Sequence, residues 1–176
     1  MNLTDICQIM KHKFKVRQAS LQDLPEALKI LEESRQWQIS QSRENTWSRS
    51  WVSHDVIREY INSGALFMAW KEANALATIG LHNEDKEHLW ADYPAGNAGY
   101  IGRLGVKREA SGSGVVNILY NELEKVAFKR GLRLLRADIY KSERVLGKWC
   151  MRKGFESYGY ATTPLGNKVR RFQKEI

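Results

Sequence analysis

Apolar and polar residues alternate over the first patterned segment of the chain, Phe14–Gln18, and this alternation predicts a β-strand. The stretch from Ser20 to Asp23 then has the spacing of a capping box that opens a helix. Four apolar residues recur on one face of that helix: Leu24, Ala27, Leu28 and Leu31. A second, short helix is expected over Val56–Asn62, because Ser63-Gly64 supplies a stop signal after it.

Two apolar runs in the middle of the chain predict a β-hairpin. Ala65–Trp70 and Leu76–Leu81 are strand-like, and the turn between them lies near Glu72–Asn74. A polar stretch, Asn83–Asn97, follows. It leads into a further apolar strand, Tyr100–Val106, so that a long connection separates the hairpin from the next strand.

The C-terminal half of the chain alternates helices and strands. Apolar residues recur at helical spacing from Val115 to Arg130, and Gly131 stands where a C-terminal glycine stop belongs. After this helix the pattern predicts, in order, a strand over Leu132–Tyr140, a helix over Val145–Arg152 and strands over Phe155–Tyr160 and Val169–Lys174. This alternation indicates an α/β protein.

The residues Ser111-Gly112-Ser113-Gly114 lie between the strand that ends at Val106 and the helix that begins at Val115. Two glycines let successive backbone N–H groups converge, and the helix adds its positive dipole end and unpaired amides. We therefore interpret the loop as a cradle for a phosphate or pyrophosphate. A Rossmann dinucleotide fingerprint fits less well, because Asn117 takes the place of its third glycine and the loop does not follow the strand in a tight turn.

Length and composition indicate one domain. The chain has 176 residues, of which 43% are hydrophobic and 27% charged, as is ordinary for a globular protein. Residues 1–13 carry no clear pattern, so we expect an N-terminal arm there and a single domain over residues 14–176. No apolar run has the length of a membrane span or the form of a signal peptide, and we expect a cytoplasmic protein without membrane contact.

Metal binding is not indicated by the cysteines and histidines. Cys7 and Cys150 are far apart and the four histidines form no spaced pair, so we expect neither a disulfide framework nor a metal site. The formal net charge of +8 suits a polyanionic partner, either nucleic acid or a phosphate-rich cofactor. Lysine and arginine are scattered over the chain, and no single basic helix emerges, so nucleic-acid binding is not favoured as the main function.

Two groups of residues resemble the GNAT superfamily of acyl-CoA-dependent N-acyltransferases. Leu104-Gly-Val106, followed six residues later by Gly112-Ser-Gly114, is similar to the strand–loop–helix signature of that family. Leu135-Arg-Ala-Asp138, with Glu143 and the later Gly154-Phe155, is similar to its closing strand and helix. The order of predicted elements agrees over nearly the whole chain. The resemblance implies an α/β, GNAT-like single domain with a mixed central sheet of about six or seven strands flanked by helices.

The same resemblance implies acetyl-CoA as cosubstrate, no metal, and direct transfer of the acetyl group to a primary amine. The fourth strand would pair with the pantetheine arm, the loop amides would hold the pyrophosphate, and the Val106 N–H would meet the oxyanion. The implied cofactor-binding residues are Leu104, Gly105, Val106, Ser111, Gly112, Ser113, Gly114, Val115 and Val116.

Four residues depart from the pattern of the family, namely Ser111, Val116, Glu143 and Cys150. Backbone amides make most of a phosphate cradle, so these departures affect binding less than catalysis. The alternative function is therefore a CoA-binding sensor or interaction module that is catalytically weak or inactive.

The candidate catalytic residues lie in and after the fifth strand: Tyr140, Glu143 and Cys150. Cys150 stands where the family often has a tyrosine that protonates the departing thiolate, although a free cysteine is more often a small buried hydrophobe. Tyr140, Tyr158 or water are the alternative proton donors. Glu143 is either a base for the incoming amine or a carboxylate that favours the start of the helix. The other candidate bases are Glu87, Asp92, His82 and His88.

Trp37, Trp47 and Trp51 lie in the segment that borders the acceptor pocket in this family. Packing is the more common role of such residues, but an aromatic wall would suit an apolar, aromatic or cationic acceptor. The sequence does not identify the amine that accepts the acetyl group, and it leaves a homodimer open.

Overall fold

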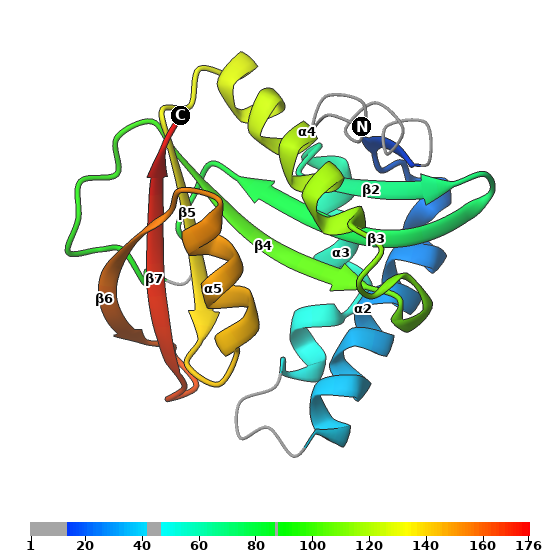
Figure 1. Ribbon diagram of the computed structural model, residues 1–176, viewed down its shortest axis with the longest axis horizontal. Coiled ribbons are helices and arrows are strands. Elements are labelled where there is room, and N and C mark those ends of the chain that lie inside the picture. The colour runs from blue at the N-terminus through cyan, green and yellow to red at the C-terminus, as the bar shows by residue number, and fades with distance from the viewer. Residues whose placement is uncertain (1–13, 42–46, 87) are drawn as a thin grey trace, which may run out of the picture. The chain divides into compact units, whose positions relative to one another are not determined.

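The structure is a computed structural model that describes residues 14–41, 47–86 and 88–176 (Figure 1). The chain divides into two compact units. Within the described residues, the first unit holds those up to residue 41 together with 47–80 and 103–123, and the second holds 81–102 and 124–176. The expected N-terminal arm, residues 1–13, lies outside the described residues, and the single domain over residues 14–176 stays a prediction.

The elements follow the predicted order, with three short 3₁₀ helices added. The strands are β1 (Lys15–Gln18), β2 (Leu66–Lys71), β3 (Asn74–His82), β4 (Ala98–Val106), β5 (Leu134–Tyr140), β6 (Glu156–Thr162) and β7 (Lys168–Glu175). The α-helices are α2 (Leu24–Ser40), α3 (His54–Asn62), α4 (Val115–Lys129) and α5 (Arg144–Arg152), and the 3₁₀ helices are η1 (Leu21–Asp23), η2 (Arg49–Val52) and η3 (Arg108–Ala110). The strands pair in the order β1-β2-β3-β4-β5-β7-β6, with β4 parallel to β5. The predicted α/β fold with a mixed sheet of about six or seven strands is confirmed.

In the first unit, α2 and α3 pack together with β2 around one apolar cluster. Its completely buried members are Ala27, Ile30, Leu31, Ile57, Leu66 and Met68. The predicted apolar face of α2 supplies much of this cluster, with Leu28 packed at its border. The strands β1 and β2 run antiparallel, as do β2 and β3, so the predicted hairpin is present.

The start of α2 is fixed by one buried carboxylate. The backbone amide and the hydroxyl of Ser20 both donate to Asp23 Oδ2, at 2.7 and 2.8 Å. The guanidinium of Arg17 donates to both oxygens of the same carboxylate, at 2.6 and 2.7 Å. The side-chain hydrogen bonds from Arg17 hold the pKa of Asp23 well below its usual value, despite the opposing effect of burial. The predicted capping box is confirmed, and Arg17 ties β1 to it.

In the second unit, β7 lies between β5 and β6 and is antiparallel to both. The strands β4 and β5 pair in parallel, from Ala98 opposite Leu134 to Ile101 opposite Ala137. The pairing ends there, although β4 continues to Val106. The helix α5 packs against β7 (Figure 1), and a Cβ at Gly147 would lie 3.5 Å from the ring of Phe172, in ordinary van der Waals contact.

Two buried arginines organise the polar connection before β4. Arg136 donates to Gln173 Oε1, the Tyr100 hydroxyl and the Pro94 carbonyl, at 2.8, 3.1 and 2.7 Å. It also lies 4.7 Å from the ring centroid of Trp90. Arg171 donates to Asp92 Oδ1 at 2.5 Å. The sequence marks this connection only as a polar segment, and it misses the buried indole on which the segment folds.

The largest local difference concerns the polar stretch after Leu31. The helix α2 continues to Ser40, whereas the sequence marks Arg35–Ser53 as a polar stretch and indicates a helical turn only in its last part, where Trp47 and Trp51 are four residues apart. Ion pairing within the helix accounts for part of this extension, because Arg35 binds Glu32 one turn away at 2.8 Å. Hydrogen bonding from Arg35 lowers the pKa of Glu32 to about 2. The helical turn suspected near Trp51 is present as the 3₁₀ helix η2.

The Asp23 contacts predict a pH-dependent stability. Asp23→Asn should lower the free energy of unfolding at pH 7 by about 1–3 kcal/mol, because charged hydrogen bonds to Arg17 are lost. A carboxyl group whose pKa is lowered in the folded state stabilises it above the unfolded pKa of about 3.9, and this contribution is lost as the pH falls toward the folded value. The difference between the two proteins in urea unfolding should therefore shrink below pH 4. The control is Asp55→Asn, whose carboxylate is exposed, and a pH-independent difference for Asp23→Asn would contradict the prediction.

Candidate functional site

The loop between β4 and α4 turns through two glycines with left-handed backbone. Gly112 has a φ of 76° and Gly114 of 85°, a region that residues with a Cβ rarely adopt. Ser113 closes the turn, since its amide and its hydroxyl donate to the Ala110 carbonyl at 3.2 and 2.6 Å. Its Oγ also accepts from the Val115 amide, at 3.4 Å. The loop is thus a folded turn held by its own hydrogen bonds.

Alternate amides of this turn are left without an acceptor. The amides of Gly112, Gly114 and Val116 donate to no atom of the described residues, whereas the amides between them are used within the turn. The helix α4 begins directly after Gly114, so its positive dipole end lies at the same place. Several converging donors without side-chain bulk fit an anion with several oxygens, such as a pyrophosphate.

The last residues of β4 lie directly against α2. A Cβ on Gly105 would lie 3.0 Å from Leu31 Cδ2 and 3.2 Å from Ile30 Cγ2, so a larger residue here would require these side chains to shift by a few tenths of an ångström. The Val106 amide donates to Ser34 Oγ at 3.0 Å, and the same hydroxyl can donate to the Val106 carbonyl at 3.4 Å. The amide that the resemblance assigns to the oxyanion therefore already has a partner, and Ser34 must turn away before this amide can serve a ligand.

The residue Arg103 interrupts the regular backbone of β4. Its φ is 52°, which is rare for a residue with a side chain and typical of a bulge in a strand. Thr78 Oγ1 donates to the Arg103 carbonyl at 2.8 Å and so supports this conformation. The guanidinium lies between two rings, 4.5 Å from the centroid of Trp51 and 4.8 Å from that of Tyr60. Gly102 and Gly105 flank this position, but the left-handed conformation falls on a residue with a side chain, which the sequence pattern does not indicate.

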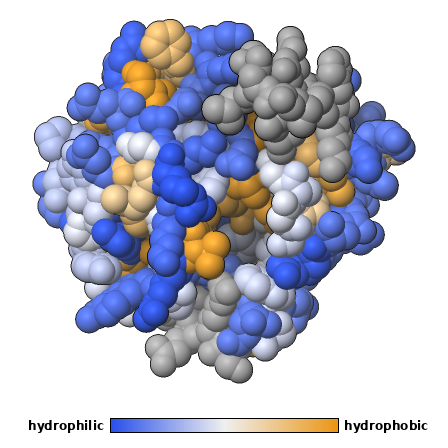
Figure 2. Space-filling view, viewed as in Figure 1, coloured by the Kyte–Doolittle hydropathy of each residue, from blue (hydrophilic) through white to orange (hydrophobic). Residues whose placement is uncertain are grey.

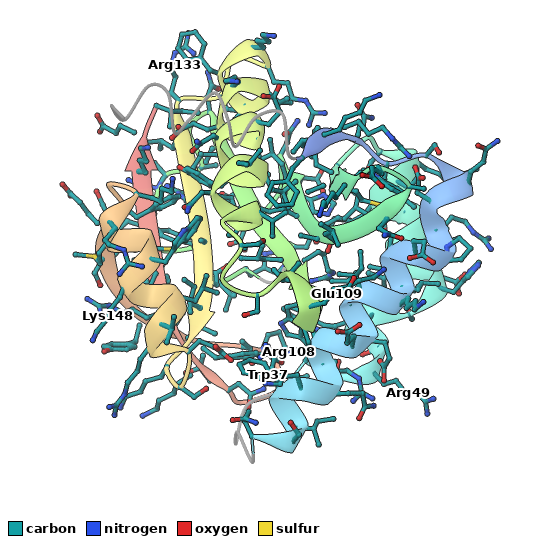
Figure 3. All side chains as sticks on the ribbon, turned by 45° about the vertical axis from the view of Figure 1, so that its right-hand side comes forward. Trp37, Arg49, Arg108, Glu109, Arg133 and Lys148 are labelled. Atoms are coloured by element: carbon teal, nitrogen blue, oxygen red, sulfur yellow. The ribbon has the colours of Figure 1, made fainter. Side chains whose placement is uncertain are left out.

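Two further contacts tie η3 to α2 just ahead of the glycine loop. The ammonium group of Lys107 lies 3.3 Å from Glu26, and the Arg108 amide donates to Glu33 Oε1 at 2.7 Å. The guanidinium of Arg108 stacks on Trp37, 4.4 Å from the ring centroid, and Figure 3 shows the two side chains next to each other. An exposed positive charge thus stands shortly before the cradle.

The three predicted catalytic residues all belong to the second unit. Tyr140 ends β5 and is buried, and Glu143 follows as the N-cap of α5, its amide donating to the Tyr140 carbonyl at 2.8 Å. Glu143 is half-buried and its side chain makes no capping hydrogen bond. Cys150 is 2% exposed, and burial raises the pKa of its thiol to about 12. These properties favour a packing role for Cys150, and its catalytic role stays a prediction.

The other candidate bases are dispersed over the second unit. Asp92 binds Arg171, and the hydrogen bond from this guanidinium lowers the pKa of the Asp92 carboxyl. His82 is buried at the end of β3 and His88 is exposed, whereas Glu87 lies outside the described residues. Tyr158 packs edge-on against Tyr93. Of these groups, Asp92 is the least suited to accept a proton, because a lowered pKa makes a weaker base.

A surface hollow of about 410 Å³ lies at the C-terminal end of α4, beside the end of β7. Figure 2 shows apolar side chains at the top of the view, where α4 ends. The hollow is lined by Glu124, Lys125, Phe128, Lys129, Lys174 and Ile176. Lys174 and Glu124 form an ion pair with each other. Arg133 stacks on Phe128, 5.2 Å from the ring centroid. The hollow offers no converging set of polar groups for chemistry.

The described residues contain neither a metal-binding cluster nor a membrane-spanning helix. Within residues 14–41, 47–86 and 88–176, no group of three or more histidine, cysteine, aspartate or glutamate side chains could hold a metal ion. In the same ranges, no helix has both the length and the apolar character needed to cross a membrane.

The sequence profile of the acetyltransferase (GNAT) family matches residues 26–155. A GNAT-family acetyltransferase from Listeria monocytogenes is similar in structure, with a TM-score of 0.72 and 24% identity over 93% of this chain and 95% of that chain. The PaiA N-acetyltransferase of Thermoplasma acidophilum, solved in complex with coenzyme A, has a TM-score of 0.70 and 18% identity over 93% of this chain and 99% of that chain. The ribosomal-protein-S18-alanine N-acetyltransferase of Escherichia coli has a TM-score of 0.68 and 14% identity over 93% of this chain and 94% of that chain. Comparison with curated protein sequences finds no match.

The family match includes the glycine loop, the strand before it and the helix that carries Cys150. The solved structures share the fold over more than nine tenths of the chain. The chain therefore belongs to the GNAT acetyltransferase family.

Proposed function

We propose that the protein is an N-acetyltransferase that moves the acetyl group of acetyl-CoA to a primary amine by direct attack. The unused amides of Gly112, Gly114 and Val116 at the positive end of α4 are the observation that carries this proposal. A pyrophosphate needs converging donors and no side chain in its way, and this loop offers both. A protein of the same fold, the Thermoplasma acidophilum PaiA N-acetyltransferase, was solved with coenzyme A.

The backbone of β4 after Ile101 supports a place for the pantetheine arm. The pairing with β5 ends at Ile101, so Leu104 has no partner in that strand, and the Val106 backbone becomes available to an extended ligand once Ser34 turns away. Leu104 and Val106 are half-buried here and would flank the arm, while Gly105 is occupied with packing against α2. Bound acetyl-CoA supplies an activated thioester, whose carbonyl carbon the amine attacks and whose sulfur leaves as a thiolate.

Two protons must move during this reaction. A lysine-like amine has a pKa of about 10.4 and must lose a proton before it attacks. Among the described residues, Glu143 is the remaining acidic candidate for the base that accepts this proton. The leaving thiolate must gain a proton. Cys150 is poorly suited, because a thiol with a pKa of about 12 would give up its proton to a coenzyme thiolate only uphill, by roughly 4 kcal/mol. We therefore place Tyr140 or water ahead of Cys150 as the donor.

A second function from another class is a CoA-binding module without efficient transfer. The burial of Cys150, in the position where the family often has a tyrosine, favours it. Both functions require the cradle, so binding does not separate them. Release of free thiol from acetyl-CoA in the presence of amines distinguishes the two functions, because only an active acetyltransferase turns over.

The first prediction on function concerns the cradle. Saturating acetyl-CoA should raise the melting temperature by about 5–10 °C, since a ligand at 100 times its Kd adds roughly 2.7 kcal/mol of stability. Gly114→Glu should abolish this shift, because it puts a negative side chain among the phosphate donors. Gly166→Glu is the matched control, since Gly166 has a φ of 81° in a turn of the second unit and open space around it. If acetyl-CoA raises the melting temperature of Gly114→Glu as much as that of the wild type, the loop is not the pyrophosphate cradle. If it does not raise the melting temperature of the wild type, acetyl-CoA is not the cosubstrate.

A second prediction concerns Cys150. Cys150→Ala should lower the free energy of unfolding by about 1–2 kcal/mol through lost packing, while turnover per folded molecule stays close to wild type. Cys150→Val fills the space left by the thiol with a side chain that has no acidic proton, and it should recover most of the stability. Thiol release measured well below both melting temperatures is the readout. A fall in turnover of about 10²-fold in both variants would instead identify the thiol as the general acid.

A further inference from the structure

Arg103 is the half-buried arginine in the first unit that has no ionic partner. Its Nε is buried and makes no hydrogen bond, and its side chain forms no ion pair with any residue that the structure describes. The two terminal nitrogens make no hydrogen bond either but are not buried, so they reach solvent. Only the rings of Trp51 and Tyr60 contact the charge.

This isolation sets Arg103 apart from the other well-packed arginines of the described chain. Arg17 also stacks on a tryptophan, at 4.7 Å, but it binds the Asp23 carboxylate. Arg136 and Arg171 likewise combine a ring contact with hydrogen bonds to oxygen acceptors. The buried Nε of Arg103 lacks an acceptor whereas its terminal nitrogens reach solvent, so the outer edge of this guanidinium is available to a ligand.

The position of Arg103 relates it to the proposed chemistry. It lies three residues before Val106 on β4, which corresponds to about 10 Å of strand. An arm that runs from the glycine cradle back along residues 106 to 103 carries its reactive end toward the bulge. The rare backbone conformation at this point also resembles the strain that proteins hold at functional sites. Arg103 thus lies beyond Val106, the residue whose amide the resemblance assigns to the oxyanion, so it can contact a group of the acceptor that is distant from the reacting amine.

We propose that Arg103 binds a carboxylate of the acceptor, so that the substrates are amines that also carry a carboxyl group. The inference rests on the proposed acetyl transfer. Trp51 and Tyr60 cover the guanidinium and leave its terminal nitrogens open, and this edge matches the two oxygens of a carboxylate. The rings also fix the guanidinium, so little side-chain entropy is lost on binding. Arg103 is then a substrate-binding residue that determines specificity.

The test compares matched acceptors that differ only in the carboxylate. The panel consists of α-amino acids, β-alanine and 4-aminobutyrate, each paired with its carboxamide, and transfer is followed as free thiol released from acetyl-CoA. The carboxamides are the easier amines to deprotonate, so a preference for the acids cannot come from amine reactivity. In the wild type, the best acid should have a KM at least about 10-fold below that of its amide, as expected for charge-assisted hydrogen bonds.

Variants of Arg103 separate recognition from folding. Arg103→Gln should raise the KM for the acid by about 10–100-fold and leave the amide within about 3-fold, because only the charged pair is lost. Glutamine adopts the left-handed backbone no less readily than arginine, so the bulge is retained. Arg103→Lys keeps the charge but lacks the planar edge of the guanidinium, so its KM for the acid should lie between those of the wild type and Arg103→Gln. Arg58→Gln removes an exposed charge from α3 and is the control that should change neither KM.

Each outcome decides for or against the inference. Equal KM values for acids and amides in the wild type, or an equal loss for both in Arg103→Gln, would overturn it and leave Arg103 as a support of the bulge. Binding of acetyl-CoA without transfer to any carboxylated amine would overturn it while the cradle stands. If acetyl-CoA does not bind, the proposed function fails, and calorimetric titration of the acids into wild type and Arg103→Gln still decides whether Arg103 binds carboxylates.

Discussion

The close approach of α2 to the end of β4 is the constraint on which the candidate site depends. At Gly105 the space for a side chain is already filled by Leu31 and Ile30. Three side chains of α2 then hold three consecutive residues, with Ser34 on Val106, Glu26 on Lys107 and Glu33 on Arg108. The chain enters the glycine turn from a position that this helix determines, so the direction of the free amides follows from packing well outside the loop.

The features that sequence predicts well are local ones. The capping box at Ser20, the glycine turn and the amphipathic helix after it each depend on residues within one or two turns of each other, and their signals lie in adjacent letters. Gly105 was predicted as a cofactor residue, and that role is untested, but the structure shows a second reason for a glycine there. The reason lies in residues of α2 more than 70 positions earlier, which no local pattern reveals.

What the sequence did not indicate depends on contacts between distant segments. The left-handed backbone at Arg103 falls on a residue with a side chain, and the rings that contact this side chain come from η2 and α3. The bonding of Ser34 to Val106 joins residues 72 positions apart. The burial of Trp90 within a polar connection depends on Arg136, which follows much later in the chain. Trp37 lies in α2 and Trp51 in η2, and each stacks on an arginine, whereas Trp47 packs on the core.

The burial of Cys150 has a consequence for its redox chemistry. Thiolate is the form that reacts with disulfide reagents and oxidants, and a thiol with a pKa of about 12 is ionised to roughly one part in 10⁵ at pH 7. The same apolar surroundings that raise this pKa also exclude the reagent. The folded protein therefore keeps this sulfur reduced under oxidising conditions, and unfolding is required before a disulfide reagent can reach it. Reaction of Cys150 with such a reagent thus reports on opening of the unit that contains α5.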